Sequence, residues 1–581
     1  MNEGGISRRD LLGAGAAMAA AGAVGSSPLA AASRGREVVP LPSAARVRAD
    51  YRRMVDFGPR LPGYVEHDRF CDWLEDEFVS TGLELIPCDE YEYDRWRPKR
   101  FALEVLDGAA PGAVRVATSF VRSKGTPPDG VVGPLVEDGP GVSAAGAVLV
   151  IDKEMTGPLW VGPWPDLQQF ADRGAKAVVF AVSKSFDELQ GNWSPHTGPY
   201  QPIPALVVDR DAGATLRAQA AARPTVRLTL DAPLKKTLVR SVTAVLPGRS
   251  EEVVIVDTHT DGQNFVEENG CMALVQLARH FESLPRRRRL DRTLVFAAWP
   301  GHMAGTLPQV RGWIAAHLDI VKRAVAAVTI EHLGATEWVD TPGKGYRGTG
   351  KNEPYVLSTT LGPATKLVKR GVHKHNLQGH VVVAAPGISV GSEFHKMGVP
   401  HVGGIAGPTY LLVVSRNGEL DKLDARLAAR QTAFYADVIR GLGRAGAEQL
   451  RGGDSSLGSE PLPTGGGSPL VQCGPAGRFV VDAGNGRRLA LRVYGRVRRD
   501  GAVLVTVAAV DGAVSGVTVE LRRGKSLHAR SAPLDANREV RRVLLRRHGH
   551  KRFSRGDYEL VVRRRGRVLE RRGVTLGSGA V

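Results

Sequence analysis

Apolar and polar positions divide the chain into regions with different secondary structure. Apolar residues recur at helical spacing across 43–85, with a turn-rich break at 56–63, so we predict two helices there. Residues 113–232 alternate short strand and helix signals, and residues 240–450 do so again with longer, wholly apolar strands. Wholly apolar strands separated by helices predict an α/β region with buried, parallel strands.

The C-terminal region follows a different pattern. Residues 451–470 are rich in Gly, Ser and Pro, which is typical of a flexible linker. Residues 471–581 then carry short runs of alternating apolar and polar residues, separated by glycine turns and without helical spacing. This pattern predicts an all-β sandwich domain that follows the α/β part of the chain.

The length and composition are those of an ordinary globular protein. The 581 residues are 43% hydrophobic and 24% charged, and the mean hydropathy is −0.15. Single hydrophobic cores rarely exceed about 250–300 residues, so we expect several domains. The composition excludes a disordered chain and a polytopic membrane protein. Four cysteines exclude a disulfide-scaffolded fold, and either a Cys71–Cys88 bond or buried free thiols would fit them.

The net charge of +18 is concentrated in the C-terminal region. Residues 478–581 hold 25 Lys and Arg against 9 Asp and Glu, a net charge of +16. A basic surface favours a polyanionic partner, for which we expect an anionic cell-wall polymer, although a solvated arginine-rich face without a partner also explains the pattern. We expect no nucleic-acid partner, because no aromatic platform or groove-reading helix accompanies the arginines.

The first 32 residues are similar to a twin-arginine export signal. The motif Ser-Arg-Arg at 7–9 precedes an apolar run at 12–24, and the small residues before Ser33 suit cleavage. The apolar run is too short to span a bilayer, so we expect no transmembrane segment. We predict export by the twin-arginine route and a secreted or envelope-associated protein.

Residue types that bind metals follow the ends of several predicted strands. They are His259, Asp261, Glu267, Glu268, His302, Glu331 and His395. The carboxyl ends of parallel strands meet at one edge of a sheet, where α/β proteins place their sites. Imidazole and carboxylate groups together suit zinc, whereas each residue taken alone could be a solvated or helix-capping residue.

Several motifs resemble the zinc aminopeptidase and glutamate-carboxypeptidase family, peptidase family M28. They are F-G-x-R-x-x-G at 57–63, His-Thr-Asp at 259–261, Glu-Glu-Asn-Gly at 267–270 and Gly-Val-Pro at 398–400. The resemblance implies an α/β peptidase domain formed by residues 43–112 and 233–450, with a mixed, mostly parallel sheet that has helices on both faces. It also implies a protease-associated (PA) domain inserted at 113–232. Members of the family bind two zinc ions bridged by a carboxylate and use a separate glutamate as general base.

The resemblance implies a role for each candidate residue. His259 corresponds to a metal ligand and Asp261 to the acid that orients it. Either Glu267 or Glu268 stands for the bridging carboxylate, and we assign Glu268 to the metal and Glu267, with Asp261, to catalysis. The remaining implied ligands are Glu331 and His395.

The chain departs from the family pattern after the strand TLVFAAW. The family has a pair of glutamates there, whereas residues 299–305 contain His302 and no carboxylate. His302 could replace the missing ligand, but the general base has no evident replacement. Two hypotheses therefore remain. One is an aminopeptidase-like hydrolase of peptides or small amides with a rewired site and up to two zinc ions; the other is a non-catalytic binding protein of the cell envelope.

Overall fold

The computed structural model describes most of the chain. The described residues are 38–86, 89–157, 164–193, 200–302, 309–384, 389–414, 418–452, 457–458, 471–472, 478–497, 501–509, 512–537, 541–547, 549, 553–554 and 556–576. The predicted export signal, Cys88 and most of the predicted linker at 451–470 lie outside the described residues. Cys71 and Cys271 are buried free thiols.

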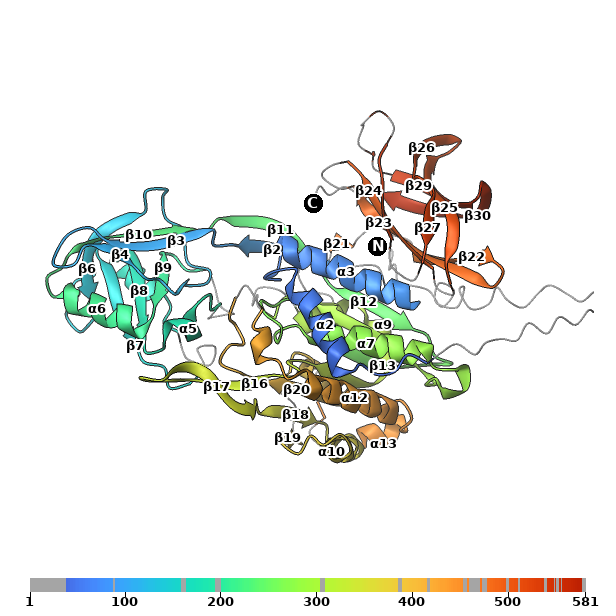
Figure 1. Ribbon diagram of the computed structural model, residues 1–581, viewed down its shortest axis with the longest axis horizontal. Coiled ribbons are helices and arrows are strands. Elements are labelled where there is room, and N and C mark those ends of the chain that lie inside the picture. The colour runs from blue at the N-terminus through green and yellow to red at the C-terminus, as the bar shows by residue number, and fades with distance from the viewer. Residues whose placement is uncertain are drawn as a thin grey trace, which may run out of the picture. The chain divides into compact units, whose positions relative to one another are not determined.

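A mixed eight-stranded sheet forms the centre of the largest region (Figure 1). Its strands, in spatial order, are β1 (Glu84–Leu85), β12 (Val242–Leu246), β14 (Arg292–Trp299), β13 (Ser250–His259), β15 (Ala324–Ile330), β20 (His401–Ala406), β18 (Tyr355–Thr359) and β19 (His380–Val383). The four central strands, β14, β13, β15 and β20, run parallel to one another. Their carboxyl ends therefore meet at one edge, as the sequence predicts.

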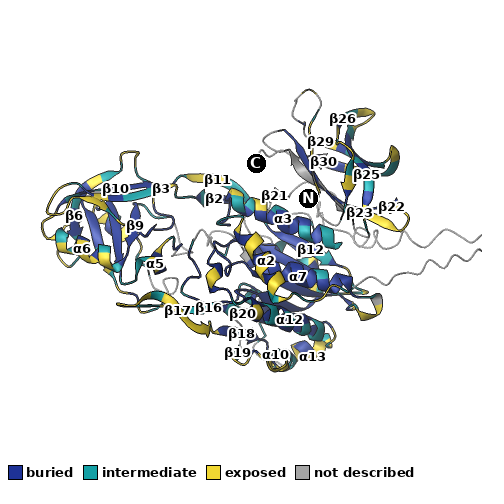
Figure 2. Ribbon diagram, in the orientation of Figure 1, coloured by how far each residue is buried: buried dark blue, intermediate teal, exposed yellow. Residues whose placement is uncertain are grey.

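Helices cover both faces of this sheet, so its strands are buried on both sides (Figure 2). One face packs against α2 (Ala44–Val55), α3 (Val65–Thr81), α7 (Gly270–Ser283), α10 (Pro363–Lys374) and α12 (Ala425–Leu442). The other face packs against α8 (Gln309–Ala316), α9 (Leu318–Arg323) and α11 (Ser392–Lys396). This two-sided burial explains why the strands are wholly apolar.

Local signals set the ends of several of these helices. The Ser43 hydroxyl accepts a hydrogen bond from the Arg46 amide at the start of α2, and Asp424 caps α12 in the same way. Helix α3 ends at Gly82, whose φ of 95° lies in the left-handed region that glycine adopts without strain. The turn-rich break at 56–63 separates α2 from α3, so the two predicted helices are confirmed.

A second eight-stranded sheet lies between the two parts of the first region in sequence. Its order is β4 (Gly112–Val114), β3 (Arg100–Val105), β10 (Thr225–Asp231), β6 (Val131–Glu137), β7 (Val148–Lys153), β8 (Ala177–Val182), β9 (Ala205–Val208) and β5 (Thr118–Ser119). Helices α4 (Gln168–Asp172), α5 (Phe186–Leu189) and α6 (Arg210–Ala220) accompany it. The antiparallel strands β2 (Asp89–Trp96) and β11 (Leu234–Arg240) flank this segment in sequence. The sheet includes β3, which precedes residue 113, and the assignment of the segment as a PA domain stays a prediction.

The C-terminal region is a sandwich of two antiparallel sheets. The first contains β22 (Arg478–Gly484), β23 (Arg487–Val497), β24 (Val503–Ala509) and β28 (Arg541–Leu545). The second contains β26 (Ser526–Arg530), β25 (Val514–Arg523), β29 (Gly556–Arg564) and β30 (Arg567–Leu576), with β27 (Leu534–Ala536) beside β25. Apolar residues of both sheets, such as Leu489 and Leu560, share one core. The alternating pattern of the sequence is thus the inner and outer faces of a sandwich.

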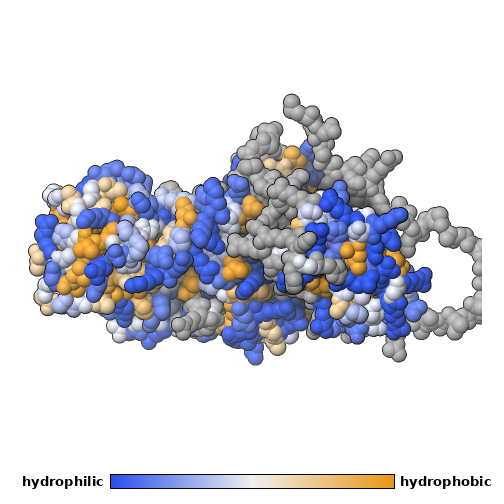
Figure 3. Space-filling model, turned by 90° about the horizontal axis from the view of Figure 1, so that it is seen from above, coloured by the Kyte–Doolittle hydropathy of each residue, from blue (hydrophilic) through white to orange (hydrophobic). Residues whose placement is uncertain are grey.

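The observed elements confirm a mixed α/β fold with additional β-rich regions. Hydrophilic and hydrophobic side chains are interspersed over the face drawn in Figure 3. Within the described part of the chain, no helix is long and apolar enough to cross a membrane.

Candidate metal centre

Three buried donor side chains meet at the carboxyl edge of the central sheet. One ligand atom each from His259, Glu267 and His332 lies within 4.8 Å of the other two. We call these residues the three-donor cluster. His259 ends β13, Glu267 precedes α7, and His332 follows β15 by two residues. The parallel register of β13 and β15 is what brings segments seventy residues apart to one place.

His259 is oriented by the main chain of its own turn. Its Nδ1 lies 2.9 Å from the carbonyl oxygen of Asp261. A carbonyl only accepts hydrogen bonds, so Nδ1 carries the proton and Nε2 presents its lone pair. Metal-binding histidines commonly donate their second ring N–H to a carbonyl in this way.

The carboxylate of Asp261 holds a different segment. Its Oδ1 accepts hydrogen bonds from the amides of Gly301 (3.0 Å) and His302 (3.3 Å), and lies 3.9 Å from His259 Nδ1. Asp261 therefore positions the turn after β14 with its side chain and His259 with its carbonyl. This division of roles differs from the one implied by the family resemblance, in which the carboxylate orients the histidine.

His302 contacts Glu267 rather than standing as an independent donor. Its Nδ1 lies 2.8 Å from Glu267 Oε1, and its ring stacks on that of His259 with centroids 4.2 Å apart. Burial lowers the pKa of His302, but the adjacent Glu267 outweighs it and the net effect raises that pKa to about 9. Burial raises the pKa of Glu267, against the effect of His302. His302 thus fixes Oε1 of Glu267, and Oε2 is the oxygen nearer to His332.

His332 enters the cluster because of an unusual backbone conformation. Its φ is 54°, in the left-handed region, and its Nδ1 hydrogen-bonds the carbonyl of Ala406. Its Nε2 lies 3.9 Å from Glu267 Oε2 and has no hydrogen-bond partner in the described structure. Burial lowers the pKa of His332 to about 3, so the ring is neutral, as a metal ligand must be.

The Asn-Gly pair before α7 stabilises this arrangement. The side-chain amide of Asn269 donates to the carbonyl of Leu333 and accepts from its amide, both at 2.8 Å. A Cβ on Gly270 would lie 2.0 Å from the carbonyl oxygen of Ile330, so only glycine allows α7 to start so close to β15. These two residues therefore position the turn that carries His332.

Glu331 lies beside the cluster but is not one of its three donors. Its Oε1 accepts a hydrogen bond from the Val390 amide at 2.8 Å, whereas Oε2 has no hydrogen-bond partner among the described residues. The side chain is fully buried, and burial raises the pKa of Glu331 to about 7. A buried carboxylate oxygen without a partner is costly to stability and commonly marks a functional site.

Glu268 is turned toward a buried arginine. Its Oε1 forms an ion pair with Arg60 Nε, and both side chains are fully buried. Arg60 also donates to the carbonyl of Asn264 at 2.7 Å, and its backbone pairs with that of Gly262. The arginine of the F-G-x-R stretch therefore braces the loop that carries the acidic pair.

His395 lies on α11 and has other contacts. Its Nδ1 lies 3.1 Å from the hydroxyl of Thr360. Thr360 in turn accepts a hydrogen bond from the backbone amide of His401. The structure thus brings His259, Glu267, His302 and Glu331 together with His332, and gives Glu268 and His395 separate partners.

His332 is not among the residues predicted from the sequence, although it directly follows Glu331. The family resemblance points to Glu331, and alternation along a strand would turn the next side chain, His332, to the opposite face. The left-handed backbone at His332 breaks that alternation, and the glycine two residues later is the one local signal of a turn. Arg60 was noted as part of a motif but without a role.

The three donors fit zinc. Zinc accepts imidazole nitrogen at about 2.0–2.1 Å and carboxylate oxygen at about 2.0–2.2 Å. Two such donors on one tetrahedral ion lie about 3.4 Å apart, close to the 3.9 Å between His332 Nε2 and Glu267 Oε2. Both histidines carry their proton on Nδ1, which leaves Nε2 available for a metal.

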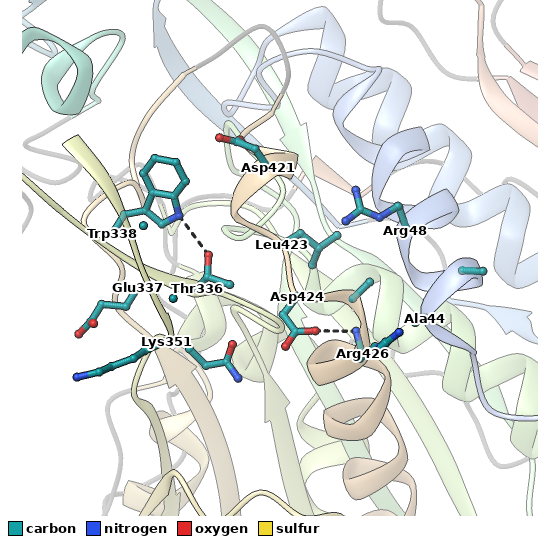
Figure 4. A pocket seen from close by; sticks show the side chains of 15 residues that line it. Ala44, Arg48, Thr336, Glu337, Trp338, Lys351, Asp421, Leu423, Asp424 and Arg426 are labelled. Atoms are coloured by element: carbon teal, nitrogen blue, oxygen red, sulfur yellow. Dashed lines mark hydrogen bonds between the residues drawn. The ribbon is translucent and has the colours of Figure 1, made fainter. Parts of the chain in front are cut away.

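Two surface pockets lie outside the cluster. One, of about 660 Å³, has both acidic and basic side chains on its wall, including Glu337, Lys351, Asp421 and Arg426 (Figure 4). The other, of about 810 Å³, is lined by Pro59 and Leu61 and by apolar residues such as Trp193. Pro59 and Leu61 flank Arg60 in sequence, so this second pocket adjoins the segment that carries Arg60.

Comparisons with known proteins place this geometry in a known fold. A zinc aminopeptidase from Bacillus subtilis superposes with a TM-score of 0.53 and 16% identity, over 73% of this chain and 100% of that one. A peptidase M28 precursor from Shewanella amazonensis superposes with a TM-score of 0.50 and 17% identity, over 72% and 98%. The resemblance to zinc aminopeptidases is therefore confirmed at the level of the fold.

The match to a protein of known sequence covers a smaller part of the chain. The chain is 34% identical over 161 residues to a probable lipoprotein aminopeptidase, LpqL, of Mycobacterium tuberculosis, a match that covers 25% of this chain. The chain spans only 30% of the length of that curated relative. No protein-family model matches the chain.

Proposed function

We propose that this protein is an exported, metal-dependent peptidase or amide hydrolase of the aminopeptidase type. The observation that carries the proposal is the three-donor cluster of His259, Glu267 and His332 at the carboxyl edge of the sheet. The fold shared with a zinc aminopeptidase supports it, as does the partial match to a lipoprotein aminopeptidase. The substrate class is a peptide or small amide, and zinc is the metal.

The chain's own residues would divide the chemistry among them. A bound zinc ion would polarise a substrate carbonyl and make a water molecule more acidic. Glu331 is the proposed proton acceptor, because its Oε2 is buried beside the cluster without a hydrogen-bond partner in the described structure. His302 holds Oε1 of Glu267 and so directs the other oxygen toward the metal position.

The assignment of roles differs from the one expected from the sequence. There, Glu267 was the catalytic carboxylate and Glu331 a ligand. The contacts favour the reverse, since Glu267 belongs to the cluster and Glu331 does not. Asp261 acts as a positioning residue for the His302 turn.

Export by the twin-arginine route, the PA assignment of the inserted segment and binding of an anionic cell-wall polymer by the C-terminal domain remain predictions from the sequence. The name of the lipoprotein aminopeptidase is consistent with an exported or envelope protein. The twin-arginine route permits a protein to fold, and to bind its metal, before export.

The proposed activity is tested with aminoacyl anilides and short peptides. We expect the purified chain to hydrolyse the aminoacyl anilide to the amino acid and the free aniline, to lose this activity in a chelator and to regain it with zinc. Each substrate is paired with its N-acetylated form, and loss of cleavage on acetylation identifies an aminopeptidase. His259→Ala, purified in parallel, controls for contaminating peptidases. Equal activity in His259→Ala, or no cleavage by zinc-loaded protein across the panel, would refute the proposal.

A further inference from the structure

We infer that the centre binds one metal ion, through His259, Glu267 and His332, rather than the two ions that its fold relatives' pattern implies. The inference rests on the proposed function, because it takes the three-donor cluster to be a metal site. Three protein donors and an open fourth position describe a catalytic single-zinc site with two histidines and one glutamate.

The first observation is the number of donors that converge. Among the residues that the structure describes, the three-donor cluster is the one group of three or more His, Cys, Asp or Glu side chains whose ligand atoms meet. A second ion at about 3.5–4 Å from the first would need further donors of its own and a carboxylate that bridges the two. The ligands expected from the sequence outside the cluster are Glu268, His302, Glu331 and His395. His302 is already placed against Glu267, with its Nδ1 2.8 Å from Oε1.

The second observation is that Arg60 already pairs with Glu268, the residue expected to bridge the two ions. The guanidinium of Arg60 is fully buried and forms an ion pair with Oε1 of Glu268. It is held there by the carbonyl of Asn264 and by the backbone bridge between Arg60 and Gly262. Oε2 of Glu268 has no hydrogen-bond partner among the described residues, so it is the charge that Arg60 supplies, and not the number of oxygens it occupies, that disfavours a second ion. If the Arg60 side chain moved away, the carboxylate of Glu268 would be left buried without a compensating positive charge, which is strongly destabilising. The positive charge that a second ion would bring to Glu268 is therefore already supplied by the protein.

The third observation concerns Glu331 and His395, two further expected ligands. One oxygen of Glu331 is held by the amide of Val390, and Glu331 stays outside the converging group. The imidazole of His395 contacts the hydroxyl of Thr360 through Nδ1. The left-handed turn at His332 brings the imidazole of this residue into the cluster. His332 directly follows Glu331, the carboxylate that was expected as a ligand. The site has thus exchanged a ligand between neighbouring residues of one strand end.

The test is the metal stoichiometry of the full-length mature protein. The protein is stripped with a chelator, reloaded with zinc or with cobalt(II), desalted, and analysed for metal by mass spectrometry. We expect one ion per chain at saturation, and the cobalt(II) protein should give the electron paramagnetic resonance spectrum of an isolated high-spin ion. Two ions per chain with a coupled cobalt spectrum, or no retained ion, would overturn the inference.

Variants separate the three donors from the expected ones. His332→Ala should retain no ion, whereas Glu331→Gln and His395→Ala should each retain one. Loss of the ion in Glu331→Gln or His395→Ala, or its retention in His332→Ala, would contradict the assignment. Thermal melting shows which variants are folded, and the wild-type stoichiometry decides the number of ions without any variant.

The outcome is independent of the activity assay. One ion in a protein that cleaves no substrate would support this inference and refute the proposed function. Two ions in an active protein would refute this inference and support the proposed function.

Discussion

Two regions of the molecule bury a glutamate completely, and the two glutamates have opposite surroundings. In the C-terminal sandwich, Glu520 on β25 contacts three arginines, with distances of 2.8 Å to Arg522, 2.6 Å to Arg530 and 3.1 Å to Arg563. At the edge of the central sheet, Glu331 has one oxygen on a backbone amide and the other without a partner in the described structure. Both side chains are 0% exposed.

The pKa values follow the surroundings. Burial opposes ionisation of Glu520, but hydrogen bonds from Arg522 and Arg530 and the charge of Arg563 outweigh it and lower its pKa. Burial prevails at Glu331 and raises its pKa to about 7. A buried carboxylate that is fully paired supports the fold, whereas one left partly unpaired costs stability and needs another reason to be there. The comparison thus separates a structural glutamate from a functional one.

The largest expected effect is on catalysis. Glu331→Gln keeps the shape of the side chain and the hydrogen bond from Val390 but removes the proton acceptor. We expect kcat to fall by about 10²–10⁴ with the metal retained. Steady-state kinetics on the best anilide, with metal content measured on the same sample, checks this. An unchanged kcat would show that Glu331 is not the proton acceptor.

Metal removal should change the thermal stability of only one of the two regions. An ion that binds only the folded state stabilises it by about 4 kcal/mol at a free concentration a thousand times the dissociation constant. Chelation should therefore lower the melting temperature of the peptidase-like region and leave the sandwich unchanged. Calorimetry with and without zinc measures this. In Glu267→Ala the chelator should have no effect, and an equal shift of both regions in the wild type would contradict a local metal site.

Removing the paired glutamate should destabilise the sandwich. Glu520→Gln leaves three arginines without their carboxylate, and we expect a loss of about 2 kcal/mol, because the arginines are partly exposed and can reach water. Arg571→Ala, which breaks the surface pair with Glu559, should cost less than about 0.5 kcal/mol and serves as the control. By contrast, Glu331→Gln in the metal-free protein should be neutral or stabilising. The free energy of unfolding by denaturant is measured for the three variants. Equal losses for Glu520→Gln and Glu331→Gln would contradict the distinction between a structural and a functional glutamate.

Mild acid should act on the central sheet before the sandwich. Burial and the nearby His395 lower the pKa of His401 to about 3, and its Nε2 contacts Thr329 and Ser389. The unfolded chain therefore binds the proton first, and stability falls as the pH drops below about 6.5, with His401 alone contributing a loss of about 1.4 kcal/mol at pH 5.5. Glu520 has a lowered pKa, so the stability it supplies is lost only below its usual value of 4.5.

The measurement is the melting temperature of each transition between pH 8 and pH 4. His401→Gln should reduce the slope of the profile of the peptidase-like region between pH 6.5 and pH 5 by the contribution of one histidine, and leave the sandwich unaffected. His67, His332 and His380, whose pKa values burial also lowers, supply further slope in both proteins. The same pH dependence in wild type and variant would show that His401 is not the group responsible.

Much of this protein could be predicted from the pattern of residues alone. Wholly apolar strands separated by helices indicated a sheet covered on both faces, because a strand buried on both sides carries apolar residues at every position. Strict alternation after residue 478 indicated a sandwich, because a strand buried on one side carries them at every second position. The carboxyl edge of the sheet was also predictable as the place of the site. It follows from the parallel direction of the strands and needs no side-chain detail.

Only the tertiary structure decided which side chains act together at that edge. His332 replaces Glu331 as a donor because its backbone turns left-handed, and a one-residue change of direction has no periodic signal. Glu268 and Glu267 are adjacent and chemically identical, yet Arg60, more than two hundred residues earlier, pairs with one and leaves the other to the cluster. Residue types and strand order are local properties of a sequence, whereas the choice between neighbouring donors depends on long-range contacts that exist only once the chain has folded.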